Sequence, residues 1–379
     1  MILKLRFFAL LILLTSCSCS DDEKIVFVDG EENREQVTDS MYPTAGEIIL
    51  DMKAGFNLGN TFDNGINTTT FSGIQPIVDL YKNAGMKHIR IPVTWMDRFE
   101  SHLADSEGHI DVNHPRFLDL VQVVDYAVEQ DMYVILNTHH EHWLKDHYDG
   151  SAGFNDKFHT LWTEIATYFR DYPVNLVFEV LNEPEGTLGE NDGSGPFPDP
   201  TDPTALEYTR KVNKVGYDAI RATGGNNATR LVMVGTNGQG NALYIDEVYP
   251  NKASLPGEGT DPYLAIQVHS YSPWSFCGET GSNSAFPGNS FFESGVQDVS
   301  VHSKLLNVPV HYGEFGVGRS SNTAERNTDL VRGYYKTMAD ATLGQSMSYC
   351  VWDDRGWFGL VNNSGTQFTY GIVPFMLGN

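Results

Sequence analysis

The sequence has few cysteines, few basic residues and no long hydrophobic run. With 25 Lys and Arg against 49 Asp and Glu, its formal net charge is −24. Affinity for nucleic acid comes mainly from Lys and Arg that neutralise phosphates, so this balance excludes nucleic acid as a partner. The apolar run Phe7–Leu14 has 8 residues, whereas a transmembrane helix needs about 20. Of the 4 cysteines, only Cys277 and Cys350 lie outside the N-terminal region, and we expect no disulfide between them.

The N-terminus has the layout of a signal peptide. Lys4 and Arg6 precede the apolar run, and small residues follow it directly before Cys17. This arrangement resembles that of bacterial lipoproteins, in which the cysteine is acylated after cleavage. We therefore expect residues 1–16 to be a signal peptide, Cys17 to be lipidated, and the protein to be anchored at the outer membrane or cell surface. The alternative is an ordinary cleaved signal and a periplasmic or secreted protein.

The chain after the expected signal peptide divides into a tether and one domain. Residues 17–43 are polar and acidic with no hydrophobic period, which is typical of a flexible segment. Residues 44–379 show no break in composition, and hydrophobic residues make up 41% of the chain. We therefore expect a single domain with a large core, and a monomer.

Eight short apolar segments alternate with helical patterns in this domain. Several are nearly continuous runs of Val, Ile, Leu and Phe, which favours parallel strands buried on both faces. The segments are 54–62, 88–95, 133–140, 176–184, 230–238, 264–273, 308–316 and 346–354, and helices are expected over Pro115–Gln130, Lys157–Arg170, Pro203–Thr223 and Thr323–Thr342. Eight strand–helix repeats predict an α/β fold, a (β/α)8 TIM barrel. A doubly wound open sheet is the alternative, but the first segment lacks its Gly-rich phosphate turn.

Polar, titratable or aromatic side chains end all eight predicted strands. In order they are Asn60 and Asp63, Arg90 and Trp95, His139 and His140, Asn182 and Glu183, Asn237, His269 and Tyr271, Glu314, and Trp352. Active sites of such barrels are built at the C-terminal ends of the strands. The recurrence therefore predicts an enzyme with its site at this rim.

Two glutamates at the rim suit the cleavage of glycosidic bonds. Glu183 ends the fourth predicted strand and Glu314 the seventh, so they would face each other across the rim. Glycosidic cleavage needs a pair of carboxyl groups, one protonated to assist the leaving oxygen and one ionised. Either glutamate alone could instead mark a strand-end turn, since Asn and Pro flank Glu183 and glycines lie beside Glu314.

Taken together, the motifs resemble glycoside hydrolase family 5. They are GFNLGNTFD, HIRIPVTW, LNTHHE, FEVLNEP, VHSYSPW, GEFG and VWDD, and the resemblance runs from Ala45 to the C-terminus. It is closest to the bacterial endo-β-1,4-glucanases, which include cellulases, lichenases and xyloglucanases. The resemblance implies a retaining mechanism with Glu183 as acid/base and Glu314 as nucleophile, and a β-glucan substrate.

The remaining rim residues are predicted to hold the substrate or the carboxylates. Arg90 is expected to lie near Glu314 and lower its pKa, and Asn182 to bind the sugar 2-hydroxyl. His269 and Tyr271 point the same way along one strand, toward the two glutamates. The full set of predicted substrate-binding residues is Asn60, Arg90, His139, His140, Trp143, Asn182, His269, Tyr271, Trp274 and Trp352.

The run His139-His140-Glu141-His142 raises the question of a metal. Neighbouring strand residues alternate in direction, so His140 is expected to face away from His139 or turn out with the loop. The spacing is also not that of a zinc-protease helix. We expect no metal and no other cofactor, and interpret the run as hydrogen-bonding groups for sugar hydroxyls.

Two further features of the sequence concern the loops and the C-terminal end, and two alternative functions stay open. Long loops at 185–203 and 274–288 suggest the walls of an open cleft and hence endo action. Only about eight residues remain for the last helix, which predicts a shortened one. A non-catalytic glycan-binding lipoprotein and a mannanase or xylanase of the same clan remain as alternatives.

Overall fold

The computed structural model describes residues 42–64, 69–97, 102–190 and 196–379. These residues belong to one compact unit, Ser40–Asn379. The expected signal peptide, its lipidated Cys17 and all but the last two residues of the tether lie outside the described residues. Within the described ranges, no helix has the length and apolar character needed to cross a membrane.

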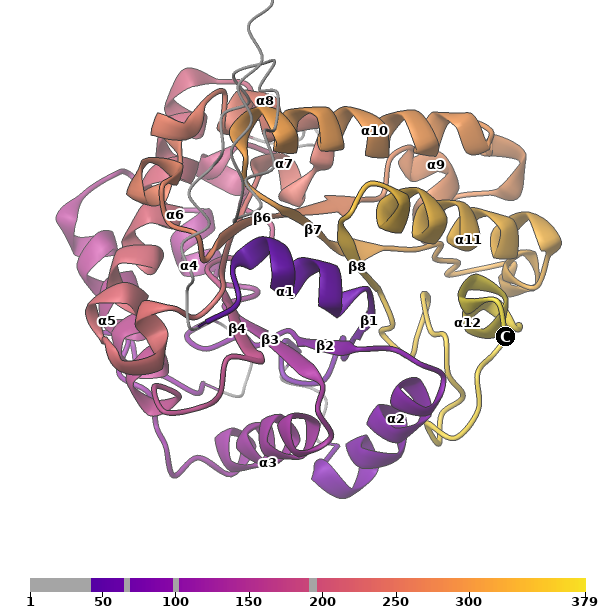
Figure 1. Cartoon of the computed structure of the whole chain (residues 1–379), viewed down its shortest axis with the longest axis horizontal. Coiled ribbons are helices and arrows are strands. Elements are labelled where there is room, and N and C mark those ends of the chain that lie inside the picture. Colours follow the sequence, from indigo (N-terminus) through magenta and orange to yellow (C-terminus); the bar gives the residue numbers. More distant parts are fainter. Residues whose placement is uncertain (1–41, 65–68, 98–101, 191–195) are drawn as a thin grey trace, which may run out of the picture. The chain divides into compact units, whose positions relative to one another are not determined.

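Eight parallel strands form a closed barrel (Figure 1). The strands are β1 Ala54–Asn57, β2 His88–Ile91, β3 Tyr133–Asn137, β4 Leu176–Glu179, β5 Val232–Gly235, β6 Leu264–Ser270, β7 Val310–Phe315 and β8 Ser348–Val351. Each pairs with the next, and β1 also pairs with β8 in parallel. The closure confirms the predicted TIM barrel, and the open-sheet alternative is wrong.

Helices surround the barrel and connect successive strands. The longer ones are α2 Phe71–Asn83, α3 Pro115–Glu129, α5 Ala152–Tyr168, α6 Pro203–Ala222, α10 Asn289–Leu306 and α11 Asp329–Gly344; the short ones are α4 His142–Lys145, α7 Asn237–Gly240, α8 Ile245–Val248, α9 Trp274–Cys277 and α12 Ile372–Leu377. Only short helical segments connect β5 to β6 within this barrel. The six residues of α12 confirm the predicted shortening of the last helix.

Two helices begin at residues other than those predicted. The predicted helix over Lys157–Arg170 starts at Ala152, directly after Ser151. The helix predicted from Thr323 starts at Asp329, because residues 323–326 form a separate 3-10 turn. There the side chain of Thr328 accepts a hydrogen bond from the backbone of Val331, which is the geometry of a helix N-cap.

An unpredicted helix, α1 (Ala45–Met52), closes one end of the barrel. Thr44 and Glu47 form a reciprocal capping box at its start. Its apolar face packs on side chains from inside the barrel in one buried cluster: Ala45, Ile48, Ile49, Met52, Ile135, Val177, Leu231, Met233 and Ala265. In the view of Figure 1, α1 lies across the centre of the ring of strands.

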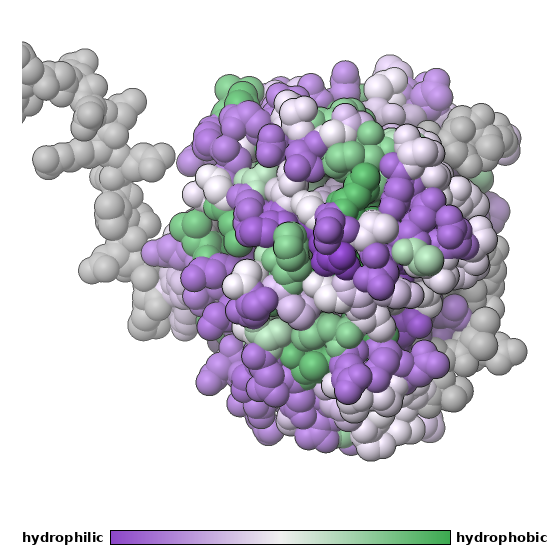
Figure 2. All heavy atoms as spheres, turned by 90° about the vertical axis from the view of Figure 1, so that its right-hand side faces the viewer, coloured by the Kyte–Doolittle hydropathy of each residue, from purple (hydrophilic) through white to green (hydrophobic). Residues whose placement is uncertain are grey.

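The outer surface shows no single dominant apolar face on the side drawn in Figure 2. That side carries α11 and α12, and hydrophobic residues there form separate patches between hydrophilic ones. The largest hydrophobic cluster of the described residues is the packing between strands and surrounding helices. The barrel interior beyond the α1 end is polar, and this polar part leads to the functional site.

Candidate active site

The two predicted glutamates meet at the C-terminal ends of their strands. Glu183 follows β4, with a φ of 44°, and Glu314 lies in β7. One carboxyl oxygen of each lies within 4.8 Å of the other and of a ring nitrogen of His269. Carboxyl groups about 5–5.5 Å apart are typical of retaining glycosidases, whereas inverting enzymes leave more room for a water molecule.

Arg90 from β2 organises the floor of the site. Its Nε and Nη2 donate to the two oxygens of Glu179 at 2.7 Å each, and its Nη1 donates to Glu314 Oε1 at 2.7 Å. Nη2 also donates to Asn182 Oδ1 at 2.7 Å. Planar, bidentate pairing of this kind fixes orientation as well as charge. Arg90 therefore holds Glu314 and Asn182, the neighbour of Glu183, in one network.

Glu179 was missed by the sequence interpretation. It is fully buried at the end of β4. Burial alone would raise its pKa, but the charge and hydrogen bonds of Arg90 bring the pKa below the ordinary value. The available signal was an acidic residue inside the apolar run LVFEV, because a charge buried in a strand requires a partner.

Glu314 is held by two donors. Besides Arg90, the hydroxyl of Tyr271 donates to Glu314 Oε2 at 3.0 Å, and both contacts favour the ionised carboxylate. Burial nevertheless raises the pKa of Glu314 above its ordinary value, while His269 and Arg90 act in the opposite direction. The predicted downward contribution of Arg90 is present, but the predicted net lowering is wrong because burial outweighs it.

Glu183 is placed to act as an acid. Burial, followed by the charge of Glu185, raises the pKa of Glu183 to about 8. Its Oε1 lies 2.8 Å from Nδ1 of His269. Burial lowers the pKa of His269 to about 4, so the imidazole is neutral at neutral pH and its other nitrogen contacts the amide of Gln267. A carboxyl group with this pKa is largely protonated at pH 7 and can donate its proton.

A cavity of about 540 Å³ opens above the two glutamates. Eight predicted residues form its wall together with five others: His139, His140, Glu183, His269, Tyr271, Trp274, Glu314, Trp352, then Gly238, Gln239, Asn241, Ser272 and Phe358. Apolar surfaces with a few aimed polar groups are typical of sites for small molecules or sugar units.

His139 and His140 both line this cavity, so neither expected orientation of His140, away from His139 or turned out with the loop, is found. Strand β3 ends at Asn137, and the alternation of a strand does not extend to residues 139 and 140. Their rings lie 4.4 Å apart between centroids at an angle of 80°. Burial lowers the pKa of His140 to about 3, so it meets a ligand as a neutral hydrogen-bonding group.

Trp352 forms one side of the cavity. Its ring is parallel to that of His139, with centroids 6.1 Å apart and 4° between the planes. A Cβ atom at Gly59 would lie 2.8 Å from the Trp352 ring, so the residue at position 59 must lack a side chain. The indole is thus backed by the chain after β1 and presents a flat face suited to a sugar ring.

Asn182 lies beside Glu183 but does not form the cavity wall. Its Oδ1 is used by Arg90, while its buried Nδ2 has no hydrogen-bond partner among the described residues. An unpartnered buried donor is costly. The amide nitrogen is therefore a donor beside Glu183 without a partner in the described part of the chain, and its contact with the sugar 2-hydroxyl stays a prediction.

The remaining predicted residues divide between the cavity and the surrounding structure. Trp274 is 50% exposed at the cavity wall. Trp143 instead stacks on Phe154 and donates to Glu141 Oε2 at 2.7 Å, and it does not contribute to the wall. Asn60 has a φ of 50° and donates its backbone N–H to Asp63; it too lies outside the wall.

Among the described residues, three groups of side chains have the composition of metal ligands. Two are at the rim, Asp63 with His139 and His140, and Glu183 with His269 and Glu314. Their carboxylates already accept hydrogen bonds from protein donors. The third group lies deeper in the barrel, at His88, His311 and Cys350. Cys277 and Cys350 are both free thiols, in line with the expectation of no disulfide.

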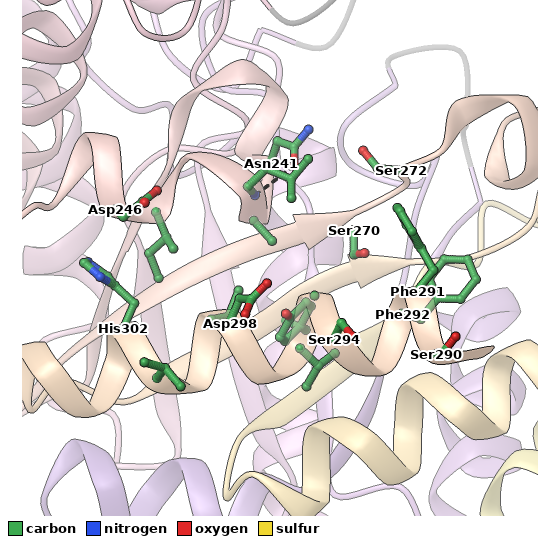
Figure 3. Close-up of a pocket in the computed structure, with 18 of the residues that line it drawn as sticks. Asn241, Asp246, Ser270, Ser272, Ser290, Phe291, Phe292, Ser294, Asp298 and His302 are labelled. Carbon is green, nitrogen blue, oxygen red and sulfur yellow. Dashed lines mark hydrogen bonds between the residues drawn. The ribbon is translucent and has the colours of Figure 1, made fainter. Parts of the chain in front are cut away.

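A larger cavity, about 810 Å³, runs beside α10 (Figure 3). It is lined on one side by α10 residues such as Phe291, Phe292 and His302 and on the other by the segment around Asn241 and Asp246. Asn241 and Ser272 border both cavities. The carboxyl pair lines only the smaller one, which is therefore the candidate active site.

Comparison with known proteins identifies the family. A sequence profile described as Cellulase (glycosyl hydrolase family 5) matches residues 54–355. The chain belongs to glycoside hydrolase family 5. The family resemblance inferred from the motifs is thereby confirmed.

Family 5 relatives match most of the chain. Endoglucanase A of Clostridium longisporum is 33% identical over 95% of this chain and 71% of its own length. Among solved structures, a GH5-4 broad specificity endoglucanase from the same organism has a TM-score of 0.72 at 27% identity, covering 88% of this chain and 97% of that one. A family 5 xyloglucanase from Paenibacillus pabuli has a TM-score of 0.73 at 25% identity, covering 87% and 99%.

Proposed function

We propose that this family 5 chain is a retaining endo-β-1,4-glucanase with Glu314 as nucleophile and Glu183 as acid/base. The observation that carries the proposal is the approach of the two carboxyl groups to within 4.8 Å at the wall of one cavity. The surrounding contacts divide the roles. Glu314 has two donors that favour its anion, and Glu183 has a raised pKa.

In the first step, Glu314 attacks the anomeric carbon while the glycosidic oxygen leaves with the proton of Glu183. The C–O bond to the leaving sugar breaks as the bond to Glu314 forms. In the second step, the Glu183 carboxylate takes a proton from water, and that water displaces Glu314 from the anomeric carbon. Asn182 Nδ2 would donate to the 2-hydroxyl in both steps.

The substrate class is inferred from the wall of the cavity and from relatives. Flat faces at Trp352 and Trp274 suit glucose rings, and polar groups around them suit equatorial hydroxyls. One similar structure is a lichenase from Caldicellulosiruptor sp. F32 and another is a xyloglucanase. We therefore propose cellulose-like β-1,4-glucan, mixed-linkage β-glucan and xyloglucan as substrates.

Release of reducing ends from mixed-linkage glucan, together with the loss of solution viscosity, tests the proposal. Endo action lowers viscosity well before many ends appear. Glu314→Gln should reduce turnover on the polymer by at least about 10³-fold, whereas Glu164→Gln, on the outer surface with His109, should retain it. NMR of the first product should show the β-anomer. Initial α-anomer, or full turnover by Glu314→Gln, would refute the mechanism.

We also propose that Cys17 is acylated and anchors the enzyme at the cell surface. The support is the order of charges, apolar run and small residues before this cysteine. Expression of the full chain with a labelled fatty acid, beside Cys17→Ser, tests this. Label in the parent and its absence in the variant are expected. An unlabelled parent chain released into the medium would contradict the anchor.

A further inference from the structure

Three buried side chains converge inside the barrel below the catalytic network. They are His88 on β2, His311 on β7 and Cys350 on β8, and all three are fully buried. Strand β1 lies between β8 and β2, and its Gly55 pairs with both His88 and Cys350. A Cβ at Gly55 would lie 2.4 Å from the His88 ring, so glycine leaves the space that this imidazole occupies.

Each imidazole has one nitrogen fixed by protein and one without a partner. Nδ1 of His88 lies 2.8 Å from the carbonyl of Met52, so it carries the proton and Nε2 presents a lone pair. Nδ1 of His311 lies 2.8 Å from Ser348 Oγ. Neither Nε2 has a hydrogen-bond partner within the described part of the chain. Buried polar atoms are almost always partnered, so these two nitrogens point to a ligand.

The third side chain supplies a sulfur. One ligand atom from each of His88, His311 and Cys350 lies within 4.8 Å of the other two. Two neutral imidazoles and one thiol form a donor set that suits Zn²⁺. Metal-binding histidines usually donate their second N–H to a carbonyl or similar acceptor, which is the arrangement of His88.

We propose that His88 Nε2, His311 Nε2 and the Cys350 thiolate bind a Zn²⁺ ion as a structural site in the barrel interior. This site differs from the rim histidines, for which the sequence predicted no metal, and it does not depend on the proposed hydrolase activity. It would join β2, β7 and β8 across Gly55 of β1. The thiol loses its proton to solvent as the ion enters.

The charges nearby favour a divalent cation. Arg90 lies two residues after His88 on β2 and contacts two carboxylates, Glu179 and Glu314. These three groups leave one net negative charge in the interior. A Zn²⁺ ion with a thiolate adds one positive charge, and the buried set becomes neutral. A buried charge without compensation is costly.

The depth of the site predicts how the ion is taken up. Because all three side chains are inaccessible in the folded protein, binding is expected to be coupled to folding. Exchange of the ion in the native protein should be slow. Chelators should act only on unfolded chains.

The test is to unfold the full chain in chelator and refold it with either Zn²⁺ or Co²⁺. After gel filtration, one ion per chain is expected, with a raised unfolding midpoint relative to refolding in chelator. The Co²⁺ form should show thiolate-to-metal absorption in the near ultraviolet. Cobalt held by Glu183, His269 and Glu314 would lack this band, because that group has no sulfur.

Matched variants test whether Cys350 supplies the sulfur ligand of the metal ion. Cys350→Ser should abolish the band and lower the ion content, whereas Cys277→Ser should retain both, since the Cys277 thiol contacts Tyr334 elsewhere in the core. If Cys350→Ser does not refold, the same measurements are made on His311→Gln, which should also lower the ion content. Wild-type protein that refolds without a band or a retained ion, as when water alone occupies the site, overturns the proposal. So does a band that persists in Cys350→Ser.

Discussion

At the scale of single residues, the electrostatic setting of Glu183 governs when the site can act. Its carboxyl group is buried beside the neutral His269, and Glu185 stands two residues away. Glu185 is in turn held by Lys145, whose Nζ lies 3.3 Å from its Oε1. The acid is thus influenced by a like charge that is itself anchored in the loop after β4.

A pH profile tests this setting. Since the acid must be protonated, kcat/KM should fall as pH rises through the pKa of Glu183, about 8. Glu185→Gln removes a like charge, which favours ionisation of Glu183 and lowers its pKa. The basic limb of the profile should therefore move to lower pH. Glu164→Gln serves as the control and should leave the limb in place; an unmoved limb in Glu185→Gln would contradict the assignment.

Site residues at strand ends could be predicted from the sequence, whereas a residue positioned by tertiary contacts could not. Glu183, Glu314, His269 and Tyr271 end strands, so the barrel alone brings them together. Gln239 lies in the short segment α7 after β5, has a non-helical φ of 63° and lines the cavity. Loop conformation depends on tertiary contacts that no local pattern records, so this residue was not predicted.

At the scale of elements, the strands were predictable and one helix was not. The strands are short segments buried on both faces, and several of them are nearly continuous apolar runs, which gives a strong local signal. Helix α1 has only eight residues, too few for a convincing period. Its stability comes from the partners of its apolar face inside the barrel rather than from its own sequence.

Helix α1 should therefore contribute strongly to stability. Ile49→Ala removes a fully buried side chain from the cluster at the closed end and should lower the free energy of unfolding by about 2–5 kcal/mol. The adjacent Leu50 is 52% exposed, so Leu50→Ala should change it by no more than about 0.5 kcal/mol. Urea unfolding of both variants measures the difference. Equal effects would show that α1 does not close the barrel.

At the scale of the whole molecule, the net charge of −24 should distinguish substrates of different charge. Carboxymethylcellulose is a polyanion and is repelled, whereas mixed-linkage glucan is neutral. Added salt shortens the screening length from about 30 Å at 0.01 M to about 8 Å at 0.15 M. The KM for carboxymethylcellulose should fall severalfold over this range.

The neutral glucan provides the control for this prediction. Its KM should stay constant over the same salt range, because no long-range repulsion exists to be screened. A parallel change for both polymers would indicate an effect of salt on the enzyme itself. Initial rates at several polymer concentrations are sufficient to decide.

Because α1 closes one end of the barrel, the buried interior can exchange protons with bulk water mainly through the opposite end. The opposite end of the interior lies under the cavity with the two carboxyl groups, where a polysaccharide would rest during turnover. A bound polysaccharide would then cover the second end of the barrel, while α1 covers the first. The buried titratable side chains between α1 and the cavity would then exchange protons with bulk water chiefly between successive catalytic cycles.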